Sequence, residues 1–132
     1  MIAPAILLAA AVVYGPYNAD VVEVIDGDTV IVDMLLAPGL TQRTSVRLLG
    51  VNTPETRSRE PCEKAAGAAA TDYTRSLLRD VRSVVVSDVR PDKYAGRVLG
   101  RIQANGADLG AEILAGGHGR PYHGEHRDPW CQ

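Results

Sequence analysis

Three short clusters of polar residues, at positions 26–29, 46–56 and 92–97, carry the side chains best suited to chemistry. The first supplies two carboxylates, and each of the other two supplies an arginine beside further polar groups. Carboxylate oxygens are preferred ligands of hard cations such as Ca²⁺, and guanidinium groups bind phosphate or carboxylate oxygens in a bidentate manner. The chain therefore holds the residue types needed to bind a cation beside an anion.

The first cluster is the run Asp26-Gly27-Asp28-Thr29. Two carboxylates at a turn that leads into a strand offer oxygen ligands to Ca²⁺ or Mg²⁺. Asp-Gly is also a favoured dipeptide in hairpin turns, so an ordinary hairpin with solvated acids is the alternative interpretation. An EF-hand is excluded because the further ligands and the closing glutamate are absent.

The second cluster begins with Arg47, which lies inside an otherwise apolar strand. Burying an unpaired arginine is costly, so Arg47 is predicted to point at a negative group. Asn52, the Thr53 carbonyl and Glu55 then follow on a loop stiffened by Pro54. The alternative is a core strand whose single arginine extends outward into solvent.

The third cluster is a polar loop at residues 92–97 that brings Arg97 to the start of a strand. Lys93, Tyr94 and Arg97 suit contacts to a phosphate and a base, whereas the alternative is a solvated turn. Taken separately, none of the three clusters decides between chemistry and structure.

The elements that must position these clusters follow from the spacing of apolar residues. Runs rich in β-branched residues, bounded by turn signals, predict strands at 19–25, 29–34, 44–49, 84–89 and 98–103, and helical spacing predicts helices at 60–79 and 109–115. The apolar face of the long helix is predicted to comprise Cys62, Ala65, Ala66, Ala69, Ala70, Tyr73, Leu77 and Leu78. This order is typical of an α+β, mainly β fold: a five-stranded OB-fold β-barrel with a long helix after strand 3 and a short helix after strand 5.

The N-terminal segment is apolar and carries no charged side chain before Asp20. Its length suits the apolar region of a secretory signal, although a basic segment before it is missing; a hydrophobic first strand is the alternative. We expect residues 1–18 to be an export signal or apolar leader and residues 19–132 to form the domain, in a secreted or periplasmic protein. No window is long enough to span a bilayer, so stable membrane insertion is not expected.

Together and in this order, the clusters resemble the staphylococcal nuclease (thermonuclease) family, whose pattern is an aspartate pair, then RLxxVDTPE, then DKYGR. The present chain has DGDT at 26–29, RLLGVNTPE at 47–55 and DKYAGR at 92–97, and the resemblance covers roughly Val21 to Tyr122. It implies the OB barrel and a Ca²⁺-dependent phosphodiesterase that acts on DNA and RNA and leaves 3′-phosphate ends.

The resemblance also implies a set of metal ligands. Asp28 matches a metal ligand, and Asp26 matches an acid in the outer shell beside it. Asn52 falls where the family has a second aspartate ligand, and the Thr53 carbonyl falls on a backbone ligand. A neutral amide at Asn52 predicts weaker Ca²⁺ binding than the family's carboxylate.

The catalytic residues are implied in the same way. Glu55 matches the general base for the attacking water, and Arg47 and Arg97 match the arginines that hold the scissile phosphate. Lys93 and Tyr94 match a contact to a terminal phosphate, although this loop is one residue longer than the common spacing. With a net charge of −2, binding of nucleic acid is expected to be local and sensitive to salt.

The tail from His118 onward lacks a regular period and is expected to wrap the barrel as a coil, in place of the family's long third helix. Tyr122 either stacks on a base or packs over the barrel. The three histidines of this tail are interpreted as solvated side chains rather than as a metal site.

The two cysteines are predicted to form a disulfide between Cys62, at the start of the long helix, and Cys131, at the end of the tail. An apolar leader implies an oxidising compartment, where such a pair would be oxidised. The bridge would pin the coil over the barrel. The alternative is two unrelated thiols in a cytosolic protein.

Three functions remain open from the sequence. The leading hypothesis is a monomeric nuclease that uses Ca²⁺ and takes DNA and RNA as substrates. A non-catalytic OB-fold module that binds nucleic acid after losing its metal is the runner-up, favoured by Asn52 alone. A structural envelope domain is the third, and it leaves the charges of the second and third clusters unexplained.

Overall fold

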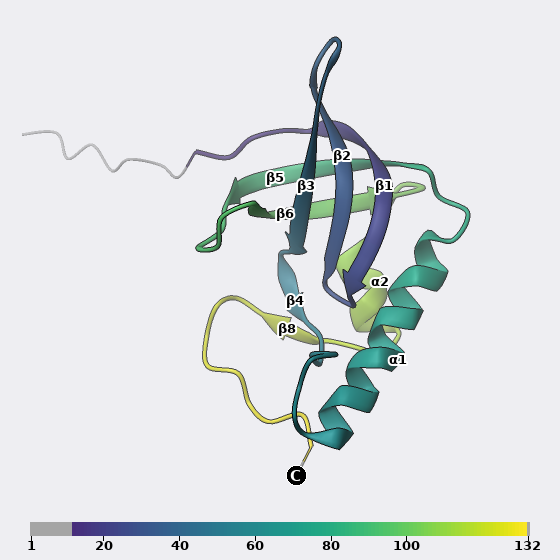
Figure 1. The fold of residues 1–132 in the computed structure, drawn as a ribbon, viewed down its shortest axis with the longest axis vertical. Coiled ribbons are helices and arrows are strands. Elements are labelled where there is room, and N and C mark those ends of the chain that lie inside the picture. The colour runs from purple at the N-terminus through teal and green to yellow at the C-terminus, as the bar shows by residue number, and fades with distance from the viewer. Residues whose placement is uncertain (1–11, 132) are drawn as a thin grey trace, which may run out of the picture.

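Five long strands form a closed barrel in the computed structural model, which describes residues 12–131 (Figure 1). They are β1 (Tyr17–Asp26), β2 (Thr29–Ala37), β3 (Leu40–Leu48), β5 (Ser83–Pro91) and β6 (Arg97–Ala104). Their order is β3-β2-β1-β5-β6, and a parallel pairing of β3 with β6 closes the sheet on itself. The predicted five-stranded OB-fold barrel is confirmed.

Three short strands were not predicted from the sequence. β4 (Gly50–Asn52) and β8 (Arg120–Tyr122) form a separate antiparallel pair. β7 (Ala107–Asp108) pairs antiparallel with the end of β6. The prediction that the whole tail is coil was therefore wrong, because β8 pairs with β4 and places the tail beside the loop that follows β4. Figure 1 shows this pair below the barrel, with the tail looping away from it.

The barrel is filled by β-branched and aliphatic side chains, as a chain without phenylalanine requires. The largest fully buried apolar residues are Val30, Val32, Val46, Val51, Val86, Ile102, Leu109 and Ile113. Leu109 and Ile113 belong to α2 (Leu109–Ala115), whose N-cap Asp108 accepts a hydrogen bond from the Ala111 amide at 2.9 Å. The predicted bounds of this helix are confirmed.

Helix α1 (Pro61–Leu78) lies close to its predicted bounds, and the predicted apolar face is buried only in part. Its buried residues are Gly67, Ala70, Thr71, Thr74 and Leu78, whereas Cys62, Ala65 and Ala69 of the predicted face are exposed. The helix packs on the apolar core through Leu78, Tyr73 and Leu77, and it also contacts polar backbone. Thr74 Oγ1 donates a hydrogen bond to the Gly27 carbonyl at 2.7 Å. At Gly67, a Cβ atom would lie 2.6 Å from the carbonyl carbon of Glu55. Small and hydroxyl side chains thus let α1 press on the turn and the loop that carry candidate residues.

Both ends of the described range contact the rest of the structure. Tyr14 forms a bridge with Val89, and β1 begins at Tyr17, so the last residues of the expected leader join the sheet. Residues 1–11, which hold most of that leader, lie outside the described residues, as does residue 132. At the other end, the predicted Cys62–Cys131 disulfide is present, with 6.2 Å between the two Cα atoms. Within residues 12–131, no helix is long and apolar enough to cross a membrane.

Candidate active site

The β1–β2 hairpin carries the two aspartates of the first cluster. Asp26 ends β1 opposite Thr29, the first residue of β2, and Asp28 occupies the turn between them. The residue Asp28 is 7% exposed. Its Oδ1 accepts from Thr29 Oγ1 at 2.9 Å, and its Oδ2 accepts from the Thr53 amide at 3.0 Å. Asp26 Oδ1 accepts from Thr56 Oγ1 at 2.7 Å. Both aspartates therefore tie the hairpin to the loop that follows β4.

Arg47, near the end of β3, is buried, and its guanidinium group donates several hydrogen bonds. Its Nη1 donates to the Leu48 carbonyl at 2.9 Å and to the Val51 carbonyl at 2.7 Å, and its Nη2 donates to Asn52 Oδ1 at 3.3 Å. Its Nη2 also lies 3.4 Å from Asp28 Oδ2. Burial lowers the pKa of Arg47, and the Asp28 carboxylate opposes that shift. Arg47 thus points at a negative group and does not extend into solvent.

A second arginine, Arg97, begins β6 and is placed beside β3 by the parallel pairing that closes the barrel. It forms an ion pair with Asp92, a residue that the sequence prediction did not single out. Its guanidinium carbon lies 4.6 Å from the centre of the Tyr94 ring. The Arg97 side chain is 28% exposed against 8% for Arg47, so a ligand reaches Arg97 more easily.

A third arginine, Arg127, comes from the tail and was also missed by the sequence prediction. Its Nη1 donates to Glu55 Oε1 at 2.9 Å, and its guanidinium carbon lies 5.3 Å from the centre of the Tyr122 ring. A hydrogen bond to Tyr122, together with the charge of Glu55, raises the pKa of Arg127. Each arginine of the site therefore faces one carboxylate: Asp28, Asp92 or Glu55.

A small cavity of about 60 Å³ brings most of the predicted residues together. Its lining includes all three predicted catalytic residues, Arg47, Glu55 and Arg97. It also includes the predicted ligands Asp26, Asp28 and Thr53, together with Thr29, Pro54 and Arg127. The two arginines and the carboxylates of the separate sequence clusters thus line one cavity.

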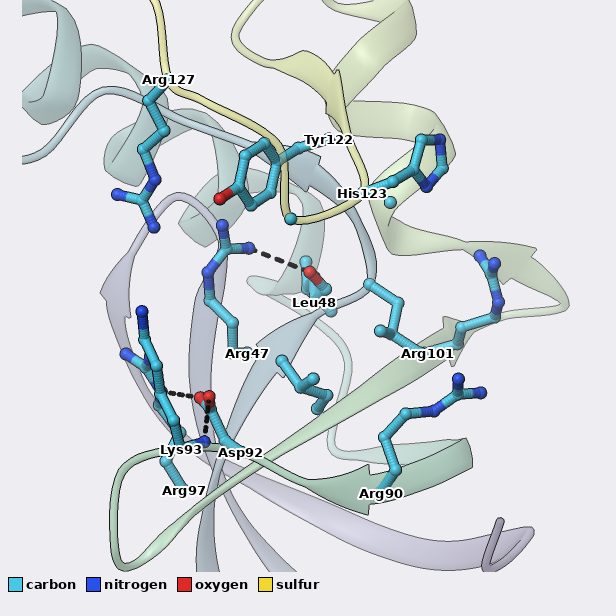
Figure 2. Close-up of a pocket in the computed structure, with 14 residues that line it drawn as sticks. Arg47, Leu48, Arg90, Asp92, Lys93, Arg97, Arg101, Tyr122, His123 and Arg127 are labelled. Carbon is cyan, nitrogen blue, oxygen red and sulfur yellow. Dashed lines mark hydrogen bonds and ion pairs between the residues drawn. The ribbon is translucent and has the colours of Figure 1, made fainter. Parts of the chain in front are cut away.

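The remaining predicted residues lie outside this cavity. Asn52 turns its side-chain oxygen toward Arg47 and lines a separate cavity with tail residues. Lys93 and Tyr122 line a larger pocket of about 520 Å³, which also borders Arg47 and Arg97 (Figure 2). Tyr94 is 56% exposed and is not part of the lining of either pocket.

The oxygen donors of the small cavity fit a loosely held hard cation. Asp26, Asp28 and Glu55 line the cavity with carboxylates, and Thr53, whose carbonyl is the predicted ligand, lines it as well. Among residues 12–131, the buried Thr53 hydroxyl has no hydrogen-bond partner. Across residues 12–131, however, no three Asp, Glu, His or Cys side chains converge on a point as a metal centre requires. Ca²⁺ takes six to eight oxygen ligands and accepts waters among them. The carboxylates present would supply part of the shell of such an ion.

Comparisons with known proteins identify the family of the chain. The family described as "Staphylococcal nuclease homologue" matches residues 45–129. The thermonuclease of Staphylococcus intermedius is 43% identical over 77 residues, which cover 58% of this chain and 42% of that relative. The match therefore spans less than half the length of the relative. The matched range contains Glu55 and all three arginines of the site, and the chain belongs to the staphylococcal nuclease family.

Proposed function

We propose that the protein is a Ca²⁺-dependent nuclease that hydrolyses phosphodiester bonds of DNA and RNA and leaves 3′-phosphate ends. The observation that carries this proposal is that Arg47, Glu55 and Arg97 line one small cavity with Asp26 and Asp28. Membership of the nuclease family and the 43% identity to a thermonuclease support it.

In the proposed reaction, Glu55 accepts a proton from a water molecule, whose oxygen forms a bond to phosphorus. The bond from phosphorus to the 5′ oxygen breaks, that oxygen takes up a proton, and the phosphate stays on the 3′ side. Arg47 and Arg97 stabilise the negative charge that develops on the phosphate oxygens. Bound Ca²⁺ would add Lewis-acid stabilisation, held by Asp26, Asp28, Thr53 and the Asn52 position.

The two arginines contribute differently. Arg47 already donates to two carbonyls and to Asn52, so it acts from a fixed position. Arg97 is more exposed and is paired with Asp92, so the phosphate must share or replace that partner. Since an ordered donor costs little reorganisation during the reaction, Arg47 suits the transition state and Arg97 suits initial capture.

A non-catalytic OB-fold module that binds nucleic acid is the alternative. Two observations favour it: Asn52 is neutral, and Glu55 is paired with Arg127 rather than left open to water. For either function we propose a secreted or periplasmic monomer. The Cys62–Cys131 disulfide supports this location, since disulfides persist in oxidising compartments.

The decisive experiment measures degradation of denatured DNA and of RNA with Ca²⁺ or with a chelator. Arg97→Ala and Glu55→Gln are each expected to lower the rate on the order of 10²–10³-fold. Arg59→Ala, an exposed arginine that lines neither pocket, is the matched control and should leave the rate unchanged. A wild-type protein that binds DNA but does not degrade it with Ca²⁺ would support the alternative.

A further inference from the structure

The larger pocket continues past the residues that the proposed reaction uses. Six cationic side chains line it and only one carboxylate, Asp92, does so. The cationic residues are Arg47, Arg90, Lys93, Arg97, Arg101 and Arg127. Four of these residues pair with a carboxylate: Arg47 with Asp28, Arg97 with Asp92, Arg101 with Asp88 and Arg127 with Glu55. Six cations against these four carboxylates leave an excess of positive charge at the pocket, in a chain with a net charge of −2.

Arg90 and Arg101 form a separate pair within this pocket. Figure 2 shows them on the opposite side from Lys93 and Arg97, with Leu48 between the two sides. Arg97 and Arg101 lie four residues apart on β6, so they share one face of the strand at a Cα separation of about 13 Å. Figure 2 shows the two side chains on opposite sides of the pocket, so each can hold a different phosphate.

The fold holds this pair in place through Asp88. An irregularity in the β5–β6 pairing falls between Ser87 and Arg90, and Asp88 there has a φ of 53°. The Asp88 carbonyl accepts from Arg90 Nε at 3.3 Å, and its carboxylate lies 3.2 Å from Arg101 Nε. Within the described part of the chain, neither arginine donates a hydrogen bond from an Nη atom. Both guanidinium groups are thus oriented through Nε with donors left for a ligand.

We infer that Arg90 and Arg101 are a second phosphate subsite for single-stranded nucleic acid, bound while the scissile phosphate lies at Arg47 and Arg97. Leu49 and Leu99, which line the pocket and are half-buried, provide an apolar surface for the nucleoside between the two charged ends. The inference rests on the proposed function for the identity of the polyanion. It makes binding depend on the number of phosphates in the substrate.

Binding in the presence of a chelator tests the subsite without cleavage. Two fluorescein-labelled probes are used, a single-stranded hexanucleotide and a dinucleotide with one phosphodiester group, and anisotropy gives the dissociation constant at several salt concentrations. For the hexanucleotide, Arg101→Gln is expected to raise the dissociation constant about tenfold, as loss of a charged hydrogen bond does. The slope of log K against log salt should fall by about 0.7, the value for one phosphate on a single strand.

The controls separate the subsite from a general loss of charge or fold. Arg82→Gln removes an equal charge at an exposed position that does not line the pocket, and should change neither quantity. Arg90→Gln should reproduce the effect of Arg101→Gln, and thermal unfolding checks that each variant is folded. Dinucleotide binding should be unchanged in both. An unchanged hexanucleotide slope in both variants, or equal losses for the two probes, would overturn the inference.

Cleavage kinetics distinguish a failed subsite from a failed proposed function. If the protein cleaves, Arg101→Gln should raise KM for a polynucleotide about tenfold and leave kcat unchanged. A wild-type protein that cleaves nothing, yet binds the hexanucleotide through Arg101, would refute the nuclease and keep the subsite. Cleavage that depends on Arg97 with a KM unaffected by Arg101→Gln would refute the subsite alone.

Discussion

Arg127 Nη1 donates a hydrogen bond to Glu55 Oε1 at 2.9 Å, joining residues that are 72 positions apart in the sequence. The tail that carries Arg127 is fixed on both sides of it. Before it, β8 pairs with β4; after it, the carbonyls of Asp128 and Pro129 accept hydrogen bonds from Arg120 at 3.3 Å. Arg120 also stacks on Trp130, with its guanidinium carbon 4.0 Å from the ring centre. An otherwise irregular segment thereby presents one arginine to the proposed general base.

Arg127→Ala is expected to lower kcat about tenfold, the smaller end of the range for partners that orient a reacting group. The reason is that Glu55 is largely exposed, with a side chain 58% accessible, and loses the one charged partner that it has among residues 12–131. Cleavage of denatured DNA at saturating substrate measures the effect. Arg127→Lys should restore part of the rate, and Arg59→Ala should be silent. A rate that rises in Arg127→Ala would mean that the tail inhibits Glu55.

The double variant Cys62→Ser/Cys131→Ser is expected to lose stability, because the bridge closes a loop with a sequence separation of 69. The chain-entropy model gives about 4 kcal/mol for a loop of this size, and measured losses are often smaller. Urea unfolding under identical buffer conditions gives the difference.

Opening the bridge is also expected to release Arg127, so the same double variant should lose activity as Arg127→Ala does. Adding Arg127→Ala to the cysteine variant should then cost little more, which a double-mutant cycle measures. Independent losses that simply add would show that the bridge does not act through Arg127. Non-reducing peptide mapping of protein made in an oxidising compartment checks that the bridge forms.

Asn52→Asp is expected to tighten Ca²⁺ binding about tenfold, the scale of a single change near a metal shell. The new carboxylate adds a negative charge next to Asp28, although Arg47 already contacts the Asn52 side chain at 3.3 Å. Calorimetric titration with Ca²⁺ gives the affinity, with Asn52→Ala as the variant that removes the oxygen. Equal or weaker affinity for the aspartate variant would argue that this position is not a ligand.

Gly67→Ala is expected to destabilise the protein by about 1–3 kcal/mol, the usual cost of overpacking. Helix propensity alone predicts the opposite sign, a gain of about 1 kcal/mol for alanine in place of glycine. The steric argument prevails because the new Cβ would meet the Glu55 carbonyl carbon at 2.6 Å and the Thr56 amide at 2.7 Å. Urea unfolding gives the sign, and a stabilised variant would contradict it. Ala68→Gly, on the exposed face of α1, is the control for propensity and should cost about 1 kcal/mol.

The sequence by itself determined the barrel strands and the position of each site cluster on them. Alternating apolar residues mark β2 and β6, and the Gly116-Gly117 pair marks the end of α2, because these signals depend on neighbours a few residues apart. The same local signals place Asp28 in the turn between β1 and β2, and Arg47 near the end of β3. Once β2 pairs with β3, Thr29 and Arg47 lie opposite each other, and the two clusters must meet.

Only the tertiary structure decided the remaining features. The buried face of α1 contains Ala70 and Leu78, as apolar periodicity predicts, but also Thr71 and Thr74. Thr74 is buried because it donates to the Gly27 carbonyl of the β1–β2 turn, a contact that apolar periodicity does not reveal. β4 and β8 have three residues each and pair across 70 positions, which leaves no periodic signal in either segment. In the sequence, nothing distinguishes Arg127 from the other charged residues of the irregular tail. The pairing of β4 with β8 and the disulfide bring it to Glu55. Contacts of this kind form between residues far apart in the sequence, when the chain closes a long loop. The spacing of apolar residues within one segment does not predict them.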